Sequence, residues 1–322
     1  MSYFLFKRLL TLLATLAVTS IVVFAVLEVL PGNAAQMLMG PDADPAAVAA
    51  KAMELGLDRP ALARYTEWIG GLLRGDMGRS YTYGAPVAEL IAERLTLTIP
   101  LAVLAMLLAT AIGLLAGVAA AARHRSPADV GLMTLAQIGI ALPNFWFAIL
   151  LILLFSVKLQ WLSAGGFDGW RFDAGLWAGL RQGLRALILP TLALAVVQAA
   201  ILARFTRSAV LEMLREDFVR TARAKGLSRR AVLWRHVLRN AMTAVMTVMG
   251  VQFAELLAGA IVVENVFYLP GLGRLVFQSI ANRDVVVVRN CVMLLAAMVV
   301  ALNFVVDVLS ALIDPRLQRR TP

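Results

Sequence analysis

The chain has 322 residues, of which 61% are hydrophobic and only 16% are charged, and its formal net charge is +10. Soluble domains are about 45–50% apolar, so this composition excludes an ordinary water-soluble fold and predicts that the chain is embedded in lipid. A single cysteine, Cys291, excludes an internal disulfide, and two histidines are too few for a histidine metal site.

Apolar segments of membrane length recur along the chain. About 20 helical residues cross a hydrocarbon core about 30 Å thick. Lys7 and Arg8 precede the first segment, as in a signal peptide, but its apolar run is too long for a typical signal core, which favours a true span. Pro143 lacks an amide donor and should distort the third span, either as a hinge or only as a bend. The six expected spans are 9–30, 96–121, 131–157, 187–207, 241–263 and 286–312.

The distribution of basic residues predicts how these spans are oriented. Lys and Arg are denser in the short segments 1–8, 122–130, 208–240 and 313–322 than in the alternate segments of the chain. The positive-inside rule therefore places these segments, and both termini, in the cytoplasm. The same bias explains the positive charge of the chain without a nucleic-acid partner.

The long segment after the first span has helix signals of its own. Asp44 followed by Pro45 can start a helix, because Asp is a favoured N-cap and Pro fits the first helical position. Asp58 begins a second, amphipathic run, and Pro86 opens a third helix. The predicted organisation is a tail and first span (1–30), a small helical extracytoplasmic region (31–95) and a five-helix core (96–322).

No familiar catalytic motif occurs in the sequence. There is no G-x-x-x-x-G-K-[ST] phosphate loop, no H-E-x-x-H zinc motif and no G-x-S-x-G nucleophile elbow. The chain is therefore not expected to hydrolyse ATP by itself, and we expect neither a bound cofactor nor a metal. A membrane enzyme would need an unfamiliar motif.

A basic segment at about 212–240 lies between the fourth and fifth spans and is predicted to form two short helices. Asp217 near the start of the first is favoured by the helix dipole, Gly226 can close that helix, and Ser228 can cap the second. Two interpretations remain open from the residues alone: a docking surface for a cytoplasmic partner, or a basic loop resting on anionic headgroups. An apolar stripe is expected at Ala231, Trp234, Leu238 and Ala241.

Motifs along nearly the whole chain resemble one family of membrane proteins. The family is that of the permease subunits of ABC importers, and more narrowly the first of the two permeases of the peptide/nickel type. The motifs that carry the resemblance are T-A-R-A-K-G-L-S (Thr221 to Ser228), R-H-V-L-R-N-A (Arg235 to Ala241), G-L-L-R-G-D-M-G-R-S (Gly71 to Ser80), L-P-N-F-W (Leu142 to Trp146), A-R-F-T-R-S (Ala203 to Ser208) and E-N-V-F-Y-L-P-G-L-G-R-L (Glu264 to Leu275).

The resemblance implies a fold, a function and a set of partners. The fold would be that of a type I ABC-importer permease in the bacterial inner membrane, working by alternating access. A homologous second permease, two cytoplasmic ATPases that bind ATP and Mg, and an extracytoplasmic substrate-binding protein would complete the importer. Cargo in this family includes di- and oligopeptides, glutathione and chelated nickel. The basic segment would be the EAA loop, which couples to the ATPases through Thr221, Ala222, Arg223, Ala224, Lys225, Gly226, Leu227 and Ser228.

A competing function is a self-contained channel or secondary transporter. Inverted repeats between the two halves would favour it, and the sequence has none that is convincing.

Polar residues within the spans suggest two further roles. Glu255 lies in the middle of the fifth span, where an ionisable residue is costly, and Gln252 and Gly259 share its helical face. These three residues either line the transport pathway or make structural hydrogen bonds. Asp307 is expected to form a structural ion pair with Arg204 or Arg207, because buried charges are normally paired.

Small residues on the second span predict a close helix contact. Ala109, Gly113 and Gly117 recur every four residues, which is the spacing of a small-xxx-small face.

Overall fold

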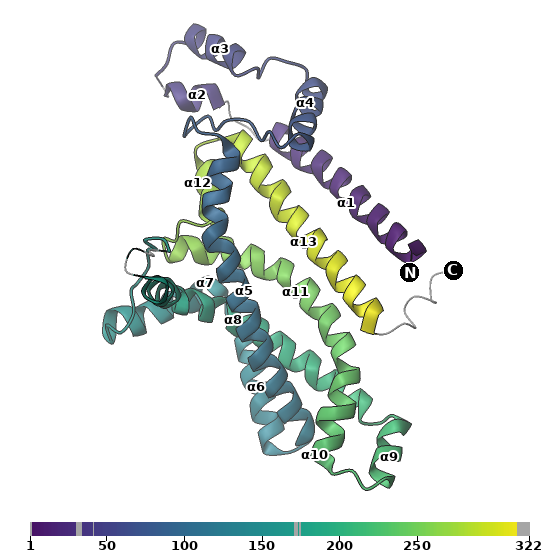
Figure 1. Ribbon diagram of the computed structural model, residues 1–322. Helices are drawn as coiled ribbons and strands as arrows, with labels where there is room; N and C mark the ends of the chain where they lie inside the picture. The colour runs from purple at the N-terminus through teal and green to yellow at the C-terminus, as the bar shows by residue number, and fades with distance from the viewer. Residues whose placement is uncertain (1, 30–33, 41, 171–172, 174, 314–322) are drawn as a thin grey trace. The chain divides into compact units, whose positions relative to one another are not determined.

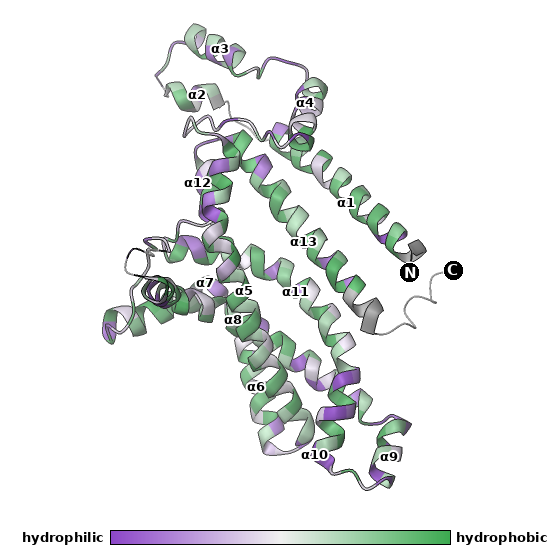
Figure 2. Ribbon diagram, in the orientation of Figure 1, coloured by the Kyte–Doolittle hydropathy of each residue, from purple (hydrophilic) through white to green (hydrophobic). Residues whose placement is uncertain are grey.

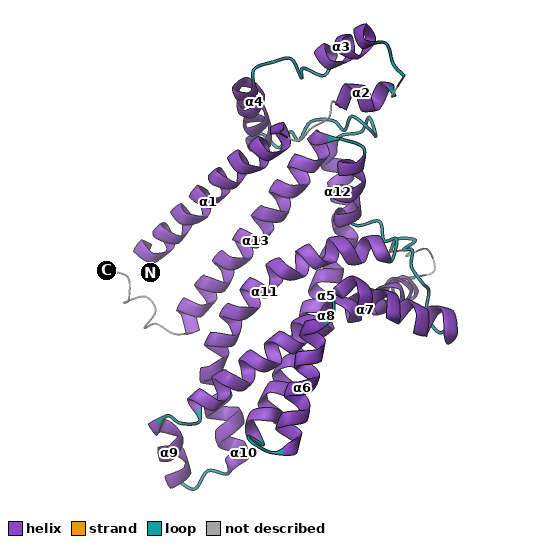
Figure 3. Ribbon diagram, turned by 180° about the vertical axis from the view of Figure 1, so that it is seen from behind, coloured by secondary structure: helices purple, strands orange, loops and turns teal. Residues whose placement is uncertain are grey.

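The computed structural model describes residues 2–29, 34–40, 42–170, 173 and 175–313. Within those residues the protein is helical, and the only strand-like pairing is an isolated bridge between Arg79 and Pro86 (Figures 1 and 3). The elements are α1 (Ser2–Val29), α2 (Ala34–Met39), α3 (Pro45–Glu54), α4 (Ala61–Leu73), α5 (Val87–Ala122), α6 (Pro127–Ala141), α7 (Asn144–Leu151), the π-helix η1 (Ile152–Lys158), α8 (Leu176–Met213), α9 (Asp217–Ala224), α10 (Arg229–Ala231), the π-helix η2 (Val232–Val237), α11 (Leu238–Val266), α12 (Leu272–Ala281) and α13 (Val285–Ile313).

Five of the described helical stretches are long and apolar enough to cross a membrane, and a bent pair of helices raises the number to six if the pair is one span. The bent pair is α6 with α7 and η1, which turn by 100° at the break. Leu142 is extended there, with ψ 121°, because a residue before proline avoids the helical region and Pro143 has no N–H to donate. The all-α fold is confirmed, and the distortion expected at Pro143 is a complete break in the helix.

The chain divides into two compact units, which are described separately. The larger unit comprises Met1–Arg8, Ile99–Leu269 and Ala301–Pro322, and the smaller unit comprises Leu9–Thr98 and Pro270–Val300. The smaller unit thus combines the helical region after the first span with most of α1, with α12 and with the first half of α13.

In the larger unit, α8 is the central helix and packs against α6, α7 and α11. Two glycines of α5 lie directly against α8. A Cβ built on Gly113 would lie 2.6 Å from Leu202 Cβ, and one on Gly117 would lie 2.6 Å from the carbonyl oxygen of Ala203. Only glycine allows these backbones to meet so closely, so the predicted small-residue contact is confirmed.

The smaller unit is held together by aromatic and polar side chains. Phe24 of α1 stacks on Trp68 of α4 with ring centroids 6.2 Å apart, and Tyr65 meets Phe24 edge-on. The buried carboxylate of Asp284 accepts hydrogen bonds from Ser80 Oγ at 2.5 Å and from the Thr82 amide at 3.0 Å. These contacts join α1, α4, the loop before α5 and the start of α13.

Of the helix starts predicted in residues 31–95, the one at Asp44 is confirmed and the later two differ in the structure. Asp44 caps α3 through a hydrogen bond from the Ala46 amide at 3.1 Å, as predicted. The second helix begins at Ala61 and not at Asp58, because Pro60 is extended. The third helix is not separate: it is the first part of α5, which runs without interruption through Pro100 into the second span.

Candidate functional site

The basic segment forms two helices joined at one glycine, as the sequence predicts. Helix α9 ends at Ala224, and Gly226 adopts a left-handed φ of +82° that ordinary side chains disfavour. The Leu227 amide then donates to the Ala222 carbonyl at 3.3 Å, which closes the helix end. Ser228 caps the next helix by accepting a hydrogen bond from the Ala231 amide at 3.3 Å.

This segment is anchored on one face and open on the other. Val219 and Ala222 are buried in a cluster with Val118 of α5 and Val210 of α8. Of the eight residues from Thr221 to Ser228, Ala222 alone is buried and the other seven are exposed. Figure 2 shows hydrophilic positions in α9, in α10 and at the start of α11, whereas α6 is mostly apolar. The anchored face fixes the loop, and the exposed face is free to meet another protein.

The apolar stripe predicted for the second helix is confirmed at Leu238 and Ala241, which join the buried cluster, and is wrong at Trp234. Val232, Leu233 and Val237 are buried, whereas Trp234 is 47% exposed. The cause is the π-helix η2 over Val232–Val237, whose wider turn shifts the face that points inward relative to an α-helix. The exposed Trp234 lines a cavity of about 940 Å³ with Arg223, Arg229 and Arg230.

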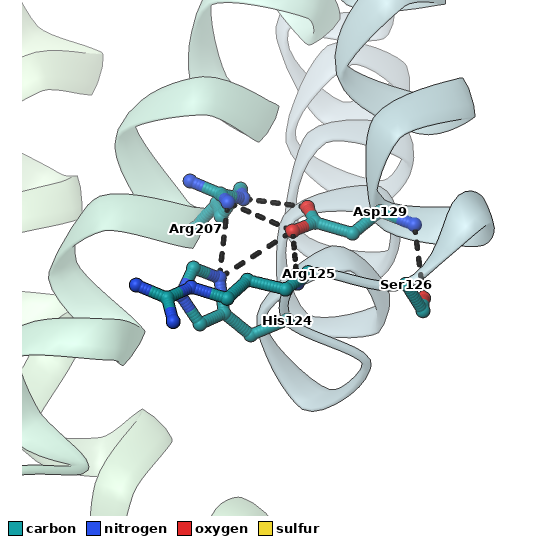
Figure 4. Close-up of polar contacts among 5 residues, drawn as sticks. All are labelled: His124, Arg125, Ser126, Asp129 and Arg207. Atoms are coloured by element: carbon teal, nitrogen blue, oxygen red, sulfur yellow. Dashed lines mark hydrogen bonds and ion pairs between the residues drawn. The ribbon is translucent and has the colours of Figure 1, made fainter.

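An ion pair that the sequence analysis missed lies near this loop (Figure 4). Arg207 of α8 donates from Nε to Asp129 Oδ1 at 2.6 Å and from Nη2 to Oδ2 at 2.8 Å. The Arg125 amide donates to Oδ2 at 2.9 Å, and His124 Nδ1 lies 3.1 Å from Arg207 Nη2. Asp129 is only 3% exposed, and its two oxygens are therefore fully engaged by a bidentate guanidinium and a backbone N–H.

A sequence signal for Asp129 did exist. Ser126 caps α6 by accepting from the Asp129 amide at 3.3 Å, with Pro127 in the first turn. Ser followed three residues later by an acidic residue is the pattern of a capping box. The pattern locates the carboxylate at a helix start but gives no information about its partner in α8.

The predicted ion pair between Asp307 and Arg204 or Arg207 is wrong. Asp307 pairs with Arg8, whose Nη1 lies 3.0 Å from Asp307 Oδ2, and Arg207 is taken by Asp129. Arg204 instead lies over the ring of Phe205, with its Cζ 5.9 Å from the centroid. The order of the spans does not determine which of the nearby basic residues pairs with Asp307.

The three candidate pathway residues of α11 do not share one environment. Gln252 is 2% exposed and donates from Nε2 to the Gln198 carbonyl of α8 at 3.2 Å. Gly259 lies against α7, where an added Cβ would be 2.8 Å from Asn144 Nδ2. Glu255 alone is exposed. Within this chain Gln252 contacts α8 and Gly259 contacts α7, and the pathway role of the three residues stays a prediction.

These features define a class of protein: a helical membrane protein of five to six spans with an anchored basic loop and no strand in the described residues. Residues 113–319 match the family described as binding-protein-dependent transport system inner membrane component, and residues 1–102 match the N-terminal region of such components. The chain belongs to this family, and it is a permease subunit of an importer.

Curated relatives match over nearly the full length. The chain is 40% identical over 318 residues to a putative peptide transport system permease protein of Brucella abortus (strain 2308), covering 99% of both chains. It is 42% identical over 316 residues to the glutathione transport system permease protein of Salmonella typhimurium (strain LT2), covering 98% of both.

A solved structure shares the fold. One chain of the MetNI methionine ABC transporter, in an inward-facing conformation, superposes with a TM-score of 0.57 at 16% identity. The match covers 70% of this chain and 96% of that chain. At this level of identity the likeness concerns the fold alone.

Proposed function

We propose that the chain forms half of the translocation pathway of an ATP-driven importer for di- or oligopeptides or a related small substrate, such as glutathione or chelated nickel. The relatives named for peptide and glutathione transport support this substrate class. The pathway opens alternately to the two sides of the inner membrane, with both termini of this chain in the cytoplasm.

This proposal rests on one observation: in residues 221–228, Ala222 is buried in the protein while the other seven residues are exposed. Ala222 is fixed in the apolar cluster, so a push on α9 is transmitted to Val118 of α5 and Val210 of α8. Two ATPase subunits, which bind ATP and Mg, would supply that push. The chain itself has no phosphate loop and no resident cofactor in this scheme. A second permease and a substrate-binding protein complete the importer.

Charge reversal at the loop tests the coupling role. In the purified importer in proteoliposomes, Arg223→Glu and Gly226→Asp should uncouple ATP hydrolysis from uptake or prevent ATPase assembly. Gly226→Asp adds a side chain where φ is +82°, and Arg223→Glu reverses the charge of an exposed residue of α9. Arg215→Glu, an equally exposed charge reversal before α9, is the matched control.

Normal uptake and normal ATPase stoichiometry in both loop variants would overturn the coupling role. A self-contained channel or secondary transporter would transport without ATP, so uptake by the permeases alone would overturn the importer proposal itself.

Glu255 is the proposed pathway residue of α11, because it is an exposed carboxylate in the middle of a membrane-length helix. A carboxylate there can attract the ammonium group of a peptide or a cationic chelate. Glu255→Gln should raise the apparent KM for such substrates without changing the amount of assembled importer. Unchanged rate and KM for every tested substrate would remove Glu255 from the pathway.

A further inference from the structure

An arginine that makes no ion pair with the described residues, Arg289, lies in the first turns of α13, in the smaller unit. The Nε of Arg289 is buried and has no hydrogen-bond partner. Its guanidinium makes no ion pair with the described residues, and its Cζ lies 5.4 Å from the ring centroid of Trp68. Removing a charge from water is costly unless it is paired and hydrogen-bonded. Glu67 and Asp284 attract this guanidinium only at a distance, so its buried Nε lacks a direct acceptor.

A second free donor lies close to Arg289. The hydroxyl of Tyr81 makes no hydrogen bond with the described residues, and the two side chains interact electrostatically. Burial raises the pKa of the Tyr81 hydroxyl, while the positive charge of Arg289 acts in the opposite direction. The phenol therefore remains protonated at neutral pH and can donate a hydrogen bond.

Both residues line one cavity of about 760 Å³. Two other arginines of its wall are already neutralised, since Arg64 pairs with Glu28 and Arg59 pairs with Glu67 at 2.7 Å. The wall also carries the carboxylates of Glu54, Asp58 and Asp76. Arg289 is its one arginine that makes no ion pair with the described residues.

The aromatic wall beside Arg289 is held rigidly. Trp68 donates from Nε1 to Asn290 Oδ1 at 3.0 Å, and Asn290 donates from Nδ2 to the Met77 carbonyl at 2.8 Å. These bonds fix the ring before any ligand arrives, and fixed supporting contacts of this kind are what a binding site requires.

We propose that this cavity is a binding site for an oxyanion, a carboxylate or phosphate group held by Arg289 and Tyr81, with the apolar part of the ligand against Trp68. A guanidinium presents a planar fork of donors that matches both groups. Two sources can supply this chemistry. One is a small soluble acid or peptide; the other is a phospholipid headgroup, because the wall includes Glu28 and Val285 at the ends of two membrane-length helices. The site does not depend on the importer role.

The test measures binding to the purified full-length permease complex. Thermal unfolding is followed in detergent while sodium succinate, a dipeptide or inorganic phosphate is added at constant ionic strength, and native mass spectrometry counts retained phospholipid. The variants are Arg289→Met, which removes the charge, Arg289→Lys, which keeps it without the fork, and Tyr81→Phe. Arg74→Gln is the matched control, because Arg74 is an exposed arginine of the same unit that does not line the cavity.

The proposal expects at least one probe to raise the unfolding temperature of the wild type and of Arg74→Gln. The effect should need about tenfold more probe in Arg289→Lys and Tyr81→Phe, and should vanish in Arg289→Met. If the source is lipid, retained phospholipid should be lost in Arg289→Met while the soluble probes have little effect. Without any probe, Arg289→Met should unfold at a temperature equal to or above the wild type in delipidated samples, since it removes a largely desolvated charge that makes no ion pair with the described residues.

Three results would overturn the proposal. The first is a probe effect that persists in Arg289→Met. The second is no probe effect and no retained lipid in the wild type, which would mean that water alone solvates Arg289. The third is an Arg289 effect that appears only when the substrate-binding protein is added, which would assign the arginine to protein docking.

Discussion

Arg207 and Arg289 both lie on membrane-length helices, yet their surroundings are opposite. Arg207 makes two hydrogen bonds to the carboxylate of Asp129, which is itself bonded to the Arg125 amide. Arg289 lines a cavity with an aromatic ring beside it, and none of the described carboxylates makes an ion pair with it. Both guanidiniums are charged at any physiological pH, so the difference lies entirely in the partners that each fold supplies.

This difference separates a structural charge from one that is available for binding. The Asp129–Arg207 pair joins α6 to α8, and its hydrogen-bonding capacity is used within the protein. The buried Nε of Arg289 has no hydrogen-bond partner, and the guanidinium makes no ion pair with the residues that the structure describes. The comparison predicts that removing a partner of Arg207 destabilises the protein, whereas removing the charge of Arg289 does not.

The largest effect is expected from Asp129→Ala. The substitution leaves Arg207, whose side chain is 23% exposed, without its carboxylate, and breaking a buried pair in this way costs about 3–5 kcal/mol. We expect a loss of stability at the lower end of this range, because the guanidinium of Arg207 remains partly exposed to solvent. Denaturant unfolding of the purified permease in detergent measures the loss. The double variant Asp129→Leu with Arg207→Met should recover most of the stability, and failure to recover would show that the pair is not the source of the effect.

A smaller effect is expected from Asn290→Ala. Asn290 is 1% exposed and bonds to the indole of Trp68 and to the carbonyl of Met77. Removing it leaves the buried N–H of Trp68 unsatisfied, at about 1–3 kcal/mol, whereas the part-buried carbonyl of Met77 can still bond to water. Unfolding should shift by about 2 kcal/mol, and oxyanion binding at Arg289 should weaken because Trp68 is no longer held. A loss of stability with unchanged anion affinity would separate Trp68 from the site.

Local features of this fold follow from the sequence because they depend on neighbours in the chain. Runs of apolar residues predict the membrane-length helices. The break at Pro143 follows because proline has no N–H to donate, and the turn at Gly226 follows because glycine readily adopts a positive φ. The caps formed by Asp44 and Ser228 follow from side chains two or three residues from the amides that they accept.

Other features depend on residues that are far apart, and the sequence pattern does not contain them. Asp129 and Arg207 are 78 positions apart, so the same rule that buried charges are paired allowed the wrong partner, Asp307. The π-helix η2 was also missed, and with it the exposure of Trp234. The assumption of a regular 3.6-residue period therefore gave the wrong face for Trp234.

The ion pair between Arg8 and Asp307 provides the smallest expected effect and the sharpest contrast with Asp129. The side chains are 45% and 34% exposed, so in water the pair should contribute about 0–1 kcal/mol and weaken with salt. Asp307→Asn should therefore change the unfolding free energy by less than about 1 kcal/mol, against several for Asp129→Ala. A loss above about 2 kcal/mol that is insensitive to salt would mean that lipid, and not water, surrounds this pair. In that case lipid would bury charges near the ends of α1 and α13 that are exposed on the isolated chain. The Arg8–Asp307 pair would then resemble the buried Asp129–Arg207 pair.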